Sequence, residues 1–464
     1  MNVVIVIVDT LRWDALACYG HPYVKTPGAD RLANEGIRFT NAFVEEPITG
    51  ASHTCVITGM RPRNHGVRYN YETSGSLPRD KRNLLDILAG NGYAVDFIHG
   101  GHGLMWGSVH LPTSNEPGTP QARVFIRRIN DIMRARRAIT QLEYEYLRAG
   151  GEAVKADVHQ RSSRGRQKPP DERISSEACQ WLDQHHQQPF CLYVHFQHPH
   201  GPMLPPEPYR SMYDPDWKEE IYDFLERAER RGPADVLTGP GYLGRDRDHF
   251  LALYEGEVSY TDNCIKQILE KLDMLGHVED TIFVLCSDHG EHFGDRFIDG
   301  NPDWPLWSKP SYLYDNFIRV PLIIRYPPLF EKGTRIEGLV QNIDITPTIL
   351  NLLHVPLSPD LDGISLLPLV TGEQDSIRNE VYAEFTGPGI VSTIEATIRT
   401  KRWKYMYNMP LLLYRGGGQP GGEELYNVGE DPAETKNLVE DKPNIAEGLR
   451  SRLYHFLKTP HPGF

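Results

Sequence analysis

Two unbroken apolar runs constrain the fold of this chain most strongly. Val3–Val8 consists only of valine and isoleucine and ends at Asp9, and the apolar run within Thr281–Ser287 ends at Asp288 and His289. Apolar runs without polar alternation are typical of strands that are buried on both faces of a parallel sheet. The carboxyl ends of such strands meet at one edge of an open α/β sheet. We therefore expect these three polar side chains to lie close together.

Composition and charge exclude some classes of protein and indicate where in the cell the chain folds. The chain has 464 residues, enough for a large and a smaller domain, and its formal net charge of −13 argues against a nucleic-acid partner. The six cysteines show no CxxC spacing, and Cys191 and Cys286 lie inside apolar runs, which indicates free buried thiols in a reducing compartment. The start, MNVVIVIVD, has no basic region, and its apolar run is too short for a signal peptide or a membrane span. We expect a cytoplasmic protein without a membrane partner.

The order of the patterns predicts an α/β domain over 1–370, in which a mostly parallel sheet is flanked by helices. A smaller α+β domain with an antiparallel sheet follows over 371–464. Thr26 is expected to cap the first helix. The further strands that we expect are 93–99, 190–196, 320–325, 381–385, 393–399, 403–407 and 424–426. The expected helices are 27–35, 84–91, 174–185, 249–275, 344–353 and 445–457.

Residues 105–170 have a different texture. Phe125–Ala149 is rich in arginine with helical spacing, and Arg161–Pro170 is polar and basic. We interpret the region as a helical insertion on the sheet domain. A solvated hairpin is one alternative; an arm that forms a homo-oligomer, or a lid over the substrate, is the other.

Thr49 lies in a compact turn that carries a hydroxyl. It follows Pro47-Ile48 and precedes the small residues Gly50-Ala51-Ser52, a pattern that predicts a strand-to-helix elbow. A hydroxyl at a helix N-terminus lies where an anionic group binds well. A simple helix cap is the alternative for this residue.

Asp9, Thr49, Asp288 and His289 together suggest a metal site. Carboxylate oxygen and imidazole nitrogen are ligands for divalent cations, whereas one aspartate at a strand end is more often a helix cap. A cation beside a hydroxyl lowers the pKa of that hydroxyl and makes it a nucleophile at neutral pH. We predict that the four side chains converge on one cation.

Four further side chains are candidates for contacts with an anionic substrate. His102 and His200 lie on loops after predicted strands, and either could protonate a leaving oxygen. His198 and His53, the latter four residues beyond Thr49 on the same helical face, are candidate substrate contacts. The alternative for each loop histidine is an ordinary surface residue.

Lys309 is the candidate for a point charge on the transferred group, with a surface lysine as the alternative.

These residues sit in motifs that extend along most of the chain and resemble the sulfatase branch of the alkaline phosphatase superfamily. The resemblance is carried by VDTLRWDALACYG, TPGADRLANEGIRFTNAF, GYAVDFIHGGHG, PFCLYVHFQHPHGPMLPP, SDHGEHFGD, RVPLII, DITPTILNLL, DGISLLPLVTG and ELYNVGEDPAETKNL. It implies an alkaline-phosphatase-like fold and a metal-dependent ester hydrolase.

The departures from the family pattern concern the nucleophile. Sulfatases carry Cys-x-Pro-Ser-Arg, whose cysteine is converted to formylglycine. Counts from both sides place Thr49 at that cysteine, Ala51 at the proline and His53 at the arginine. Gly100 stands at a family lysine, and Thr10 at the second aspartate of the usual metal pair. The resemblance thus implies a variant without formylglycine.

A threonine nucleophile is similar to that of related phosphodiesterases and phosphoethanolamine transferases. The Asp-His pair and Asn70 resemble phosphonate monoester hydrolases, with Asn70 as a candidate substrate contact and an ordinary loop residue as its alternative. Relatives with two metals need a further Asp-x-x-x-His, and only Asp273/His277 and Asp288/His292 have that spacing. We therefore expect one divalent ion, zinc, manganese or calcium.

The sequence thus predicts a hydrolase that cleaves phosphate or phosphonate esters through Thr49, with a small anionic ester as its substrate. Three alternatives stay open: a sulfate-ester hydrolase that uses unmodified threonine, a phosphoryl-group transferase, and a binding protein without catalysis.

Overall fold

The computed structural model describes residues 1–68, 77, 81–99, 170–201, 203–217, 245–293, 313–385, 395–408 and 422–458. Three of the predicted site residues lie outside these ranges, namely Asn70, His102 and Lys309. The predicted insertion at 105–170 also lies outside them, apart from its last residue. Within the described residues, no helix is long and apolar enough to cross a membrane.

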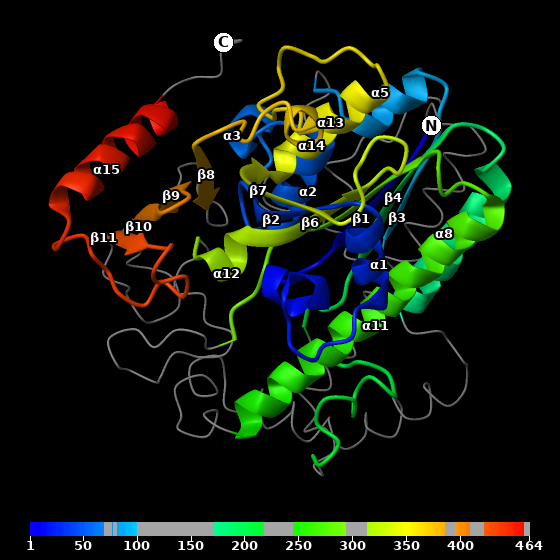
Figure 1. The fold of residues 1–464 in the computed structure, drawn as a ribbon, viewed down its shortest axis with the longest axis horizontal. Helices are drawn as coiled ribbons and strands as arrows, with labels where there is room; N and C mark the ends of the chain where they lie inside the picture. Colours follow the sequence, from blue (N-terminus) through cyan, green and yellow to red (C-terminus); the bar gives the residue numbers. More distant parts are fainter. Residues whose placement is uncertain are drawn as a thin grey trace, which may run out of the picture.

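The large sheet has seven strands in the order β3-β4-β1-β5-β6-β2-β7 (Figure 1). β6 runs antiparallel to both of its neighbours, and the other neighbouring pairs are parallel. The predicted, mostly parallel sheet is therefore confirmed. The strand bounds are β1 Asn2–Val8, β2 Ile37–Phe43, β3 Ala94–His99, β4 Phe190–Phe196, β5 Thr281–Ser287, β6 Arg319–Arg325 and β7 Thr334–Gln341.

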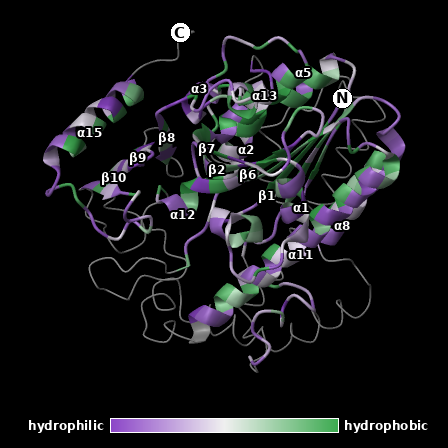
Figure 2. Cartoon of the chain, in the orientation of Figure 1, coloured by the Kyte–Doolittle hydropathy of each residue, from purple (hydrophilic) through white to green (hydrophobic). Residues whose placement is uncertain are grey.

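Helices cover both faces of this sheet, which explains the unbroken apolar runs. Side chains alternate along a strand, so Val3, Ile5 and Ile7 of β1 face one core and Val4, Val6 and Val8 face the other. The first core is closed by α2 Thr49–Thr58, α5 Leu84–Gly90, α13 Ile345–Leu352 and α14 Leu367–Val370. The second is closed by α1 Pro27–Glu35, α8 Pro170–His185 and α11 Arg245–Leu275. Figure 2 shows the hydrophobic strands between the two helical layers.

The N-terminus of α1 is capped from a distant helix. Thr26 is the N-cap residue of α1, as predicted, but its hydroxyl makes no capping hydrogen bond. Instead, the backbone N–H groups of Gly28 and Ala29 donate to the Asp262 carboxylate of α11 at 2.8 and 2.7 Å. A Cβ at position 28 would lie 2.9 Å from the Asp262 carbonyl oxygen, so glycine permits this approach.

A second, antiparallel sheet has the strand order β11-β10-β9-β8 (Figure 1). Its strands are β8 Glu380–Phe385, β9 Glu395–Thr400, β10 Trp403–Asn408 and β11 Gly422–Asn427, and α15 Pro443–Lys458 packs against it. Buried Lys404 of β10 lies 2.8 Å from Asp315 of α12 Asp315–Ile318 and 2.6 Å from Glu434. This ion cluster joins the small sheet to the segment that leads into β6. The remaining short helices are η1 Trp13–Ala15, η2 Ala17–Tyr19, α3 Pro62–His65 and η3 Asn342–Asp344.

Candidate active site and metal centre

The ends of β1 and β5 place two aspartates side by side. Val8 pairs with Ser287 in parallel register, so Asp9 and Asp288 leave the sheet together at its carboxyl edge. The Ser287 hydroxyl accepts a hydrogen bond from the Leu11 N–H at 3.0 Å and lies 2.8 Å from the Val8 carbonyl oxygen. The two loops are thus tied to each other directly beneath the carboxylates.

Asp9, Asp288 and His289 form a compact donor group, with one ligand atom from each within 4.8 Å of the others. His289 Nε2 lies 3.9 Å from Asp9 Oδ1 and 3.7 Å from Asp288 Oδ2. These distances are too long for hydrogen bonds. They match the roughly 3–4 Å between two ligands of one cation, given metal–ligand bonds of about 2 Å.

The polar atoms in this group fit a bound divalent cation. Both carboxylate oxygens of Asp9, and Oδ2 of Asp288, are buried and have no hydrogen-bond partner among the described residues. A buried carboxylate is costly unless it is paired or coordinates a metal. His289 Nδ1 lies 2.8 Å from the Gly290 carbonyl oxygen, so Nδ1–H donates and the Nε2 lone pair faces the carboxylates. The described residues therefore contain a candidate ligand set for one cation.

The two aspartates perturb each other. Burial raises the pKa of Asp9, but the nearby His200, His195 and His289 side chains bring this pKa below its ordinary value. Burial together with the charge of Asp9 raises the pKa of Asp288 to about 8. Two neighbouring carboxylates that share one pocket resist ionising together. A divalent cation bound between the two carboxylates would remove this conflict.

Thr49 lies beside the same group. It is the first residue of α2, and its Oγ1 lies 3.5 Å from His289 Nε2. The positive end of α2 is directed at this position. The cysteine nearest to Thr49 in the sequence, Cys55, lies buried in the middle of α2 with its Sγ 3.4 Å from His65 Nε2, and burial raises the pKa of its thiol. The N-terminus of α2 thus presents the Thr49 hydroxyl to the cluster.

Thr10 adopts a strained backbone at the edge of the site. Its φ of 56° lies in the left-handed region, which a β-branched residue rarely enters. In this conformation its N–H donates to Asp288 Oδ1 at 3.0 Å, while the Tyr254 hydroxyl donates to its carbonyl oxygen at 3.1 Å. The strain therefore helps to orient the Asp288 carboxylate.

Two further histidines adjoin the cluster, and sequence reasoning missed one of them. His53 is fully buried in α2, and its Nε2 lies 3.9 Å from Asp288 Oδ2, so it faces a carboxylate rather than solvent. His195 of β4 lies with its Nε2 3.6 Å from Asp9 Oδ2. A signal for it exists in the sequence, because His195 is the only polar side chain of FCLYVHF apart from the Tyr193 hydroxyl.

The two predicted loop histidines occupy different surroundings. His200 is partly buried, donates from Nδ1 to the Gly201 carbonyl oxygen at 2.8 Å, and is close enough to Asp9 to lower the pKa of that carboxyl. His198 instead has its Nδ1 3.1 Å from Asp171 of α8 and its Nε2 4.0 Å from Glu257 of α11. The substrate contacts assigned to these histidines stay predictions, and His200 is the better placed of the two.

Comparison with known proteins supplies the family. The family model described as sulfatase matches residues 1–355. The chain belongs to the sulfatase family. A second model, described as N-sulphoglucosamine sulphohydrolase, C-terminal, matches residues 303–459. The predicted membership in the alkaline phosphatase superfamily is confirmed.

Relatives of this sulfatase-family chain differ in the activities in their names. It is 26% identical to an arylsulfatase of Clostridium perfringens, covering 100% of this chain and 95% of the relative. It is also 26% identical to a multifunctional alkaline phosphatase superfamily protein of Trinickia caryophylli, over 83% of this chain and 80% of the relative. The fold is similar to that of phosphonate monoester hydrolase of Agrobacterium radiobacter, with a TM-score of 0.68, 21% identity, and coverage of 98% and 95% of the two chains. The chain is thus a sulfatase-family hydrolase of sulfuric or phosphoric esters.

Proposed function

We propose that this sulfatase-family enzyme hydrolyses phosphate or phosphonate esters with unmodified Thr49 as its nucleophile. One observation carries the proposal: Thr49 begins α2 with its hydroxyl 3.5 Å from His289 Nε2, beside the Asp9 and Asp288 carboxylates. A cysteine that could be converted to formylglycine is not at this position.

The side chains have separate roles in the proposed reaction. When bound by Asp9, Asp288 and His289, a divalent cation would supply positive charge that lowers the pKa of a neighbouring hydroxyl and offsets charge on the transferred group. The Thr49 hydroxyl gives up its proton to solvent, and its oxygen forms a bond to phosphorus while the bond to the ester oxygen breaks. Water then attacks phosphorus, the bond between phosphorus and the Thr49 oxygen breaks, and the hydroxyl is restored.

His200 is proposed to hold the proton that the leaving oxygen takes. Its Nδ1 lies 2.8 Å from the Gly201 carbonyl oxygen, and the ring is close enough to Asp9 to lower the pKa of that carboxyl, which places an imidazole beside the cluster. His102, Asn70 and Lys309 remain proposed as contacts to the leaving group and the transferred group. A small anionic ester as substrate and a cytoplasmic location remain part of the proposal.

Hydrolysis of sulfate esters is the second candidate function. The arylsulfatase of Clostridium perfringens, which is similar to this chain over its whole length, favours it. A tetrahedral sulfate group has the shape of a phosphate group and differs from it mainly in charge.

Turnover of matched aryl esters separates the two functions. Nitrophenyl phosphate, a nitrophenyl phosphonate, bis-nitrophenyl phosphate and nitrophenyl sulfate release the same chromophore, so their kcat/KM values compare directly. The proposal expects at least one phosphorus ester to exceed the sulfate ester by tenfold or more with zinc, manganese or calcium added. A sulfate ester that is cleaved faster than all three phosphorus esters would establish the second candidate instead.

A further inference from the structure

A second group of donors surrounds Asp288, on the side of α2 and β4. His53, His195 and Asp288 each place one ligand atom within 4.8 Å of the other two. The two imidazole rings are 4.5 Å apart between centroids and nearly perpendicular, with an interplanar angle of 79°. Neither histidine is more than 1% exposed.

The facing atoms of this group lack hydrogen-bond partners. Nε2 of His53, Nε2 of His195 and Oδ2 of Asp288 are all buried, and none makes a hydrogen bond within the described part of the chain. Buried polar atoms are nearly always bonded, so three such atoms, on residues whose ligand atoms lie within 4.8 Å of one another, indicate a ligand. The 3.9 Å between His53 Nε2 and Asp288 Oδ2 is too long for a direct hydrogen bond.

Tyr193 fixes the orientation of the His53 ring in the way that is usual for a histidine that binds a metal. Its hydroxyl lies 2.7 Å from His53 Nδ1. When His53 Nδ1–H donates to this hydroxyl, the lone pair of Nε2 faces Asp288. A histidine that binds a metal through one ring nitrogen usually donates a hydrogen bond from the other, which fixes the orientation of the ring.

Asp288 is shared between the two donor groups. Its Oδ1 accepts the backbone N–H groups of Thr10 at 3.0 Å and His289 at 2.8 Å, so Oδ2 is the oxygen left for cations. That oxygen lies 3.9 Å from His53 Nε2 and 3.7 Å from His289 Nε2. One carboxylate can therefore serve both groups.

We propose that His53, His195 and Asp288 bind a second divalent cation, with Asp288 shared between it and the cation of Asp9 and His289. Two imidazoles and one carboxylate form a set that suits zinc and leaves a coordination position open. Binding of this cation stands on the geometry alone, whereas its use in catalysis rests on the proposed function. Paired cations can stabilise both the attacking and the leaving oxygen of an in-line displacement.

The sequence spacing led to the expectation of a single cation, and the second site uses other residues. Asp288/His292 has the Asp-x-x-x-His spacing, but it reuses Asp288. In the structure, His292 Nδ1 lies 3.0 Å from the Asn316 side-chain nitrogen, and His292 belongs to neither donor group of the described residues.

Zinc content measures the second site without any substrate. The full-length protein is stripped with a chelator, loaded with zinc, desalted and analysed by mass spectrometry of the metal. We expect two zinc ions per chain in the native protein and one in His53→Gln and His195→Gln. Asp9→Asn should also retain one ion, held by the other group, and Asp288→Asn should lose both. Tyr193→Phe should weaken the second ion's affinity roughly 10- to 100-fold.

His292→Gln and His65→Gln are the matched controls, because both replace buried histidines outside the donor group, and both should keep two ions. Circular dichroism and thermal unfolding confirm that each variant is folded. One zinc ion in the native protein, or two in a folded His195→Gln variant, would overturn the second site. A protein that binds two ions but cleaves no phosphorus ester would refute the proposed function and leave the second site standing.

Discussion

At the scale of single residues, buried charge is placed where a specific partner compensates it. His198 is an example outside the metal group, because two carboxylates from different helices, Asp171 and Glu257, face its ring. Burial alone would lower the pKa of His198, but the Asp171 carboxylate and then Glu257 raise it to about 9. The ion pair thus holds the loop after β4 against α8 and α11, beside the predicted acid His200.

The stability that His198 contributes should depend on pH. Its pKa in the folded protein lies above the ordinary value of 6.5, so its contribution is complete below about pH 6.5 and disappears as pH rises through 9. We expect His198→Gln to lower the free energy of unfolding by on the order of 2–3 kcal/mol more at pH 6 than at pH 9.5. Urea unfolding of both proteins at the two pH values measures this difference. Equal losses of unfolding free energy at both pH values would show that Asp171 and Glu257 do not keep His198 charged. Substitution of the exposed His455 by Gln serves as the control.

At the scale of elements, the strands that were predicted are those with unbroken apolar runs. β1, β4 and β5 are buried on both faces, and their ends were expected within one residue. β2 and β7 were not predicted, because IRFTNAF and TRIEGLVQ mix charged and apolar residues with only partial burial. The sequence pattern within one strand does not show which other strand will pair with it in the sheet.

Long-range partners explain the other failures at this scale. Thr26 has the residue type of a helix cap, yet the capping carboxylate comes from Asp262, more than 200 positions away. His195 was read as part of an apolar strand, and only the meeting of β4 with β1 and α2 shows that it faces Asp9 and His53. Sequence spacing within one segment could not reveal either contact.

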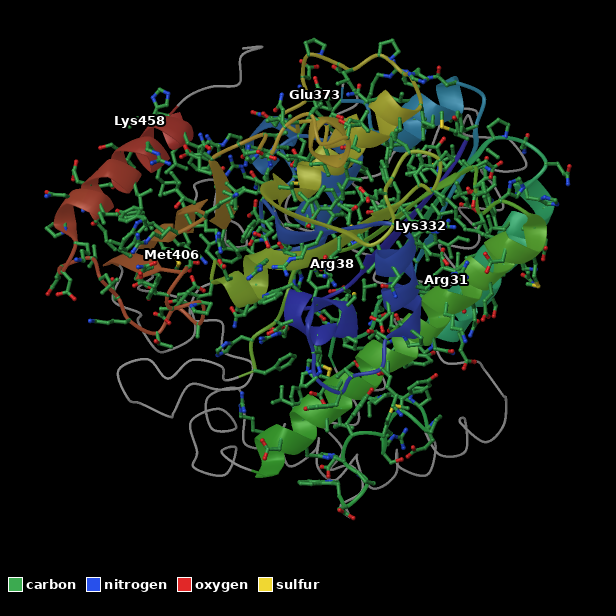
Figure 3. The ribbon with its side chains drawn as sticks, viewed as in Figure 1. Arg31, Arg38, Lys332, Glu373, Met406 and Lys458 are labelled. Carbon is green, nitrogen blue, oxygen red and sulfur yellow. The ribbon has the colours of Figure 1, made fainter. Side chains whose placement is uncertain are left out.

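The cap on α1 gives a test at the scale of elements. Asp262→Ala removes the acceptor of two backbone N–H groups in a buried place, so we expect it to lower the free energy of unfolding by about 1–2 kcal/mol. Asp273→Ala on the same helix is the control. This substitution removes only the exposed ion pair between Asp273 and Arg31, so it should lower the free energy of unfolding by less than about 1 kcal/mol. Figure 3 labels Arg31 where α1 meets α11. Chemical denaturation compares the two, and equal losses would argue against the cap.

At the scale of the whole molecule, the candidate site exists because separate elements end at one edge of the large sheet. β1 leads to Asp9, β5 leads to Asp288 and His289, β4 supplies His195, and α2 supplies Thr49 and His53. The Asp9, Thr49, Asp288 and His289 group was predicted from sequence because three short segments carry it. The residues 69–76 and 294–312, which include Asn70 and Lys309, lie outside the described ranges, so their predicted contacts stay predictions.

The nucleophile is the claim on which the account depends most. Thr49→Ala should lower kcat for the best phosphorus ester by at least about 10³-fold without loss of folding, because Thr49 ends a turn and contributes little to the core. Thr49→Ser should retain part of the rate, since it keeps the hydroxyl. Thr49→Ser should also keep the metal content of the native protein, because it retains a hydroxyl at the predicted fourth ligand position.

The most direct measurement is mass spectrometry of the enzyme quenched during turnover of a slow phosphorus ester. We predict that the peptide containing Thr49 gains one phosphoryl or phosphonyl group, located on Thr49 by fragmentation, and that Thr49→Ala shows no such gain. An unmodified Thr49 peptide in an enzyme that is turning over the ester, together with near-native turnover by Thr49→Ala, would contradict the covalent mechanism proposed for this site.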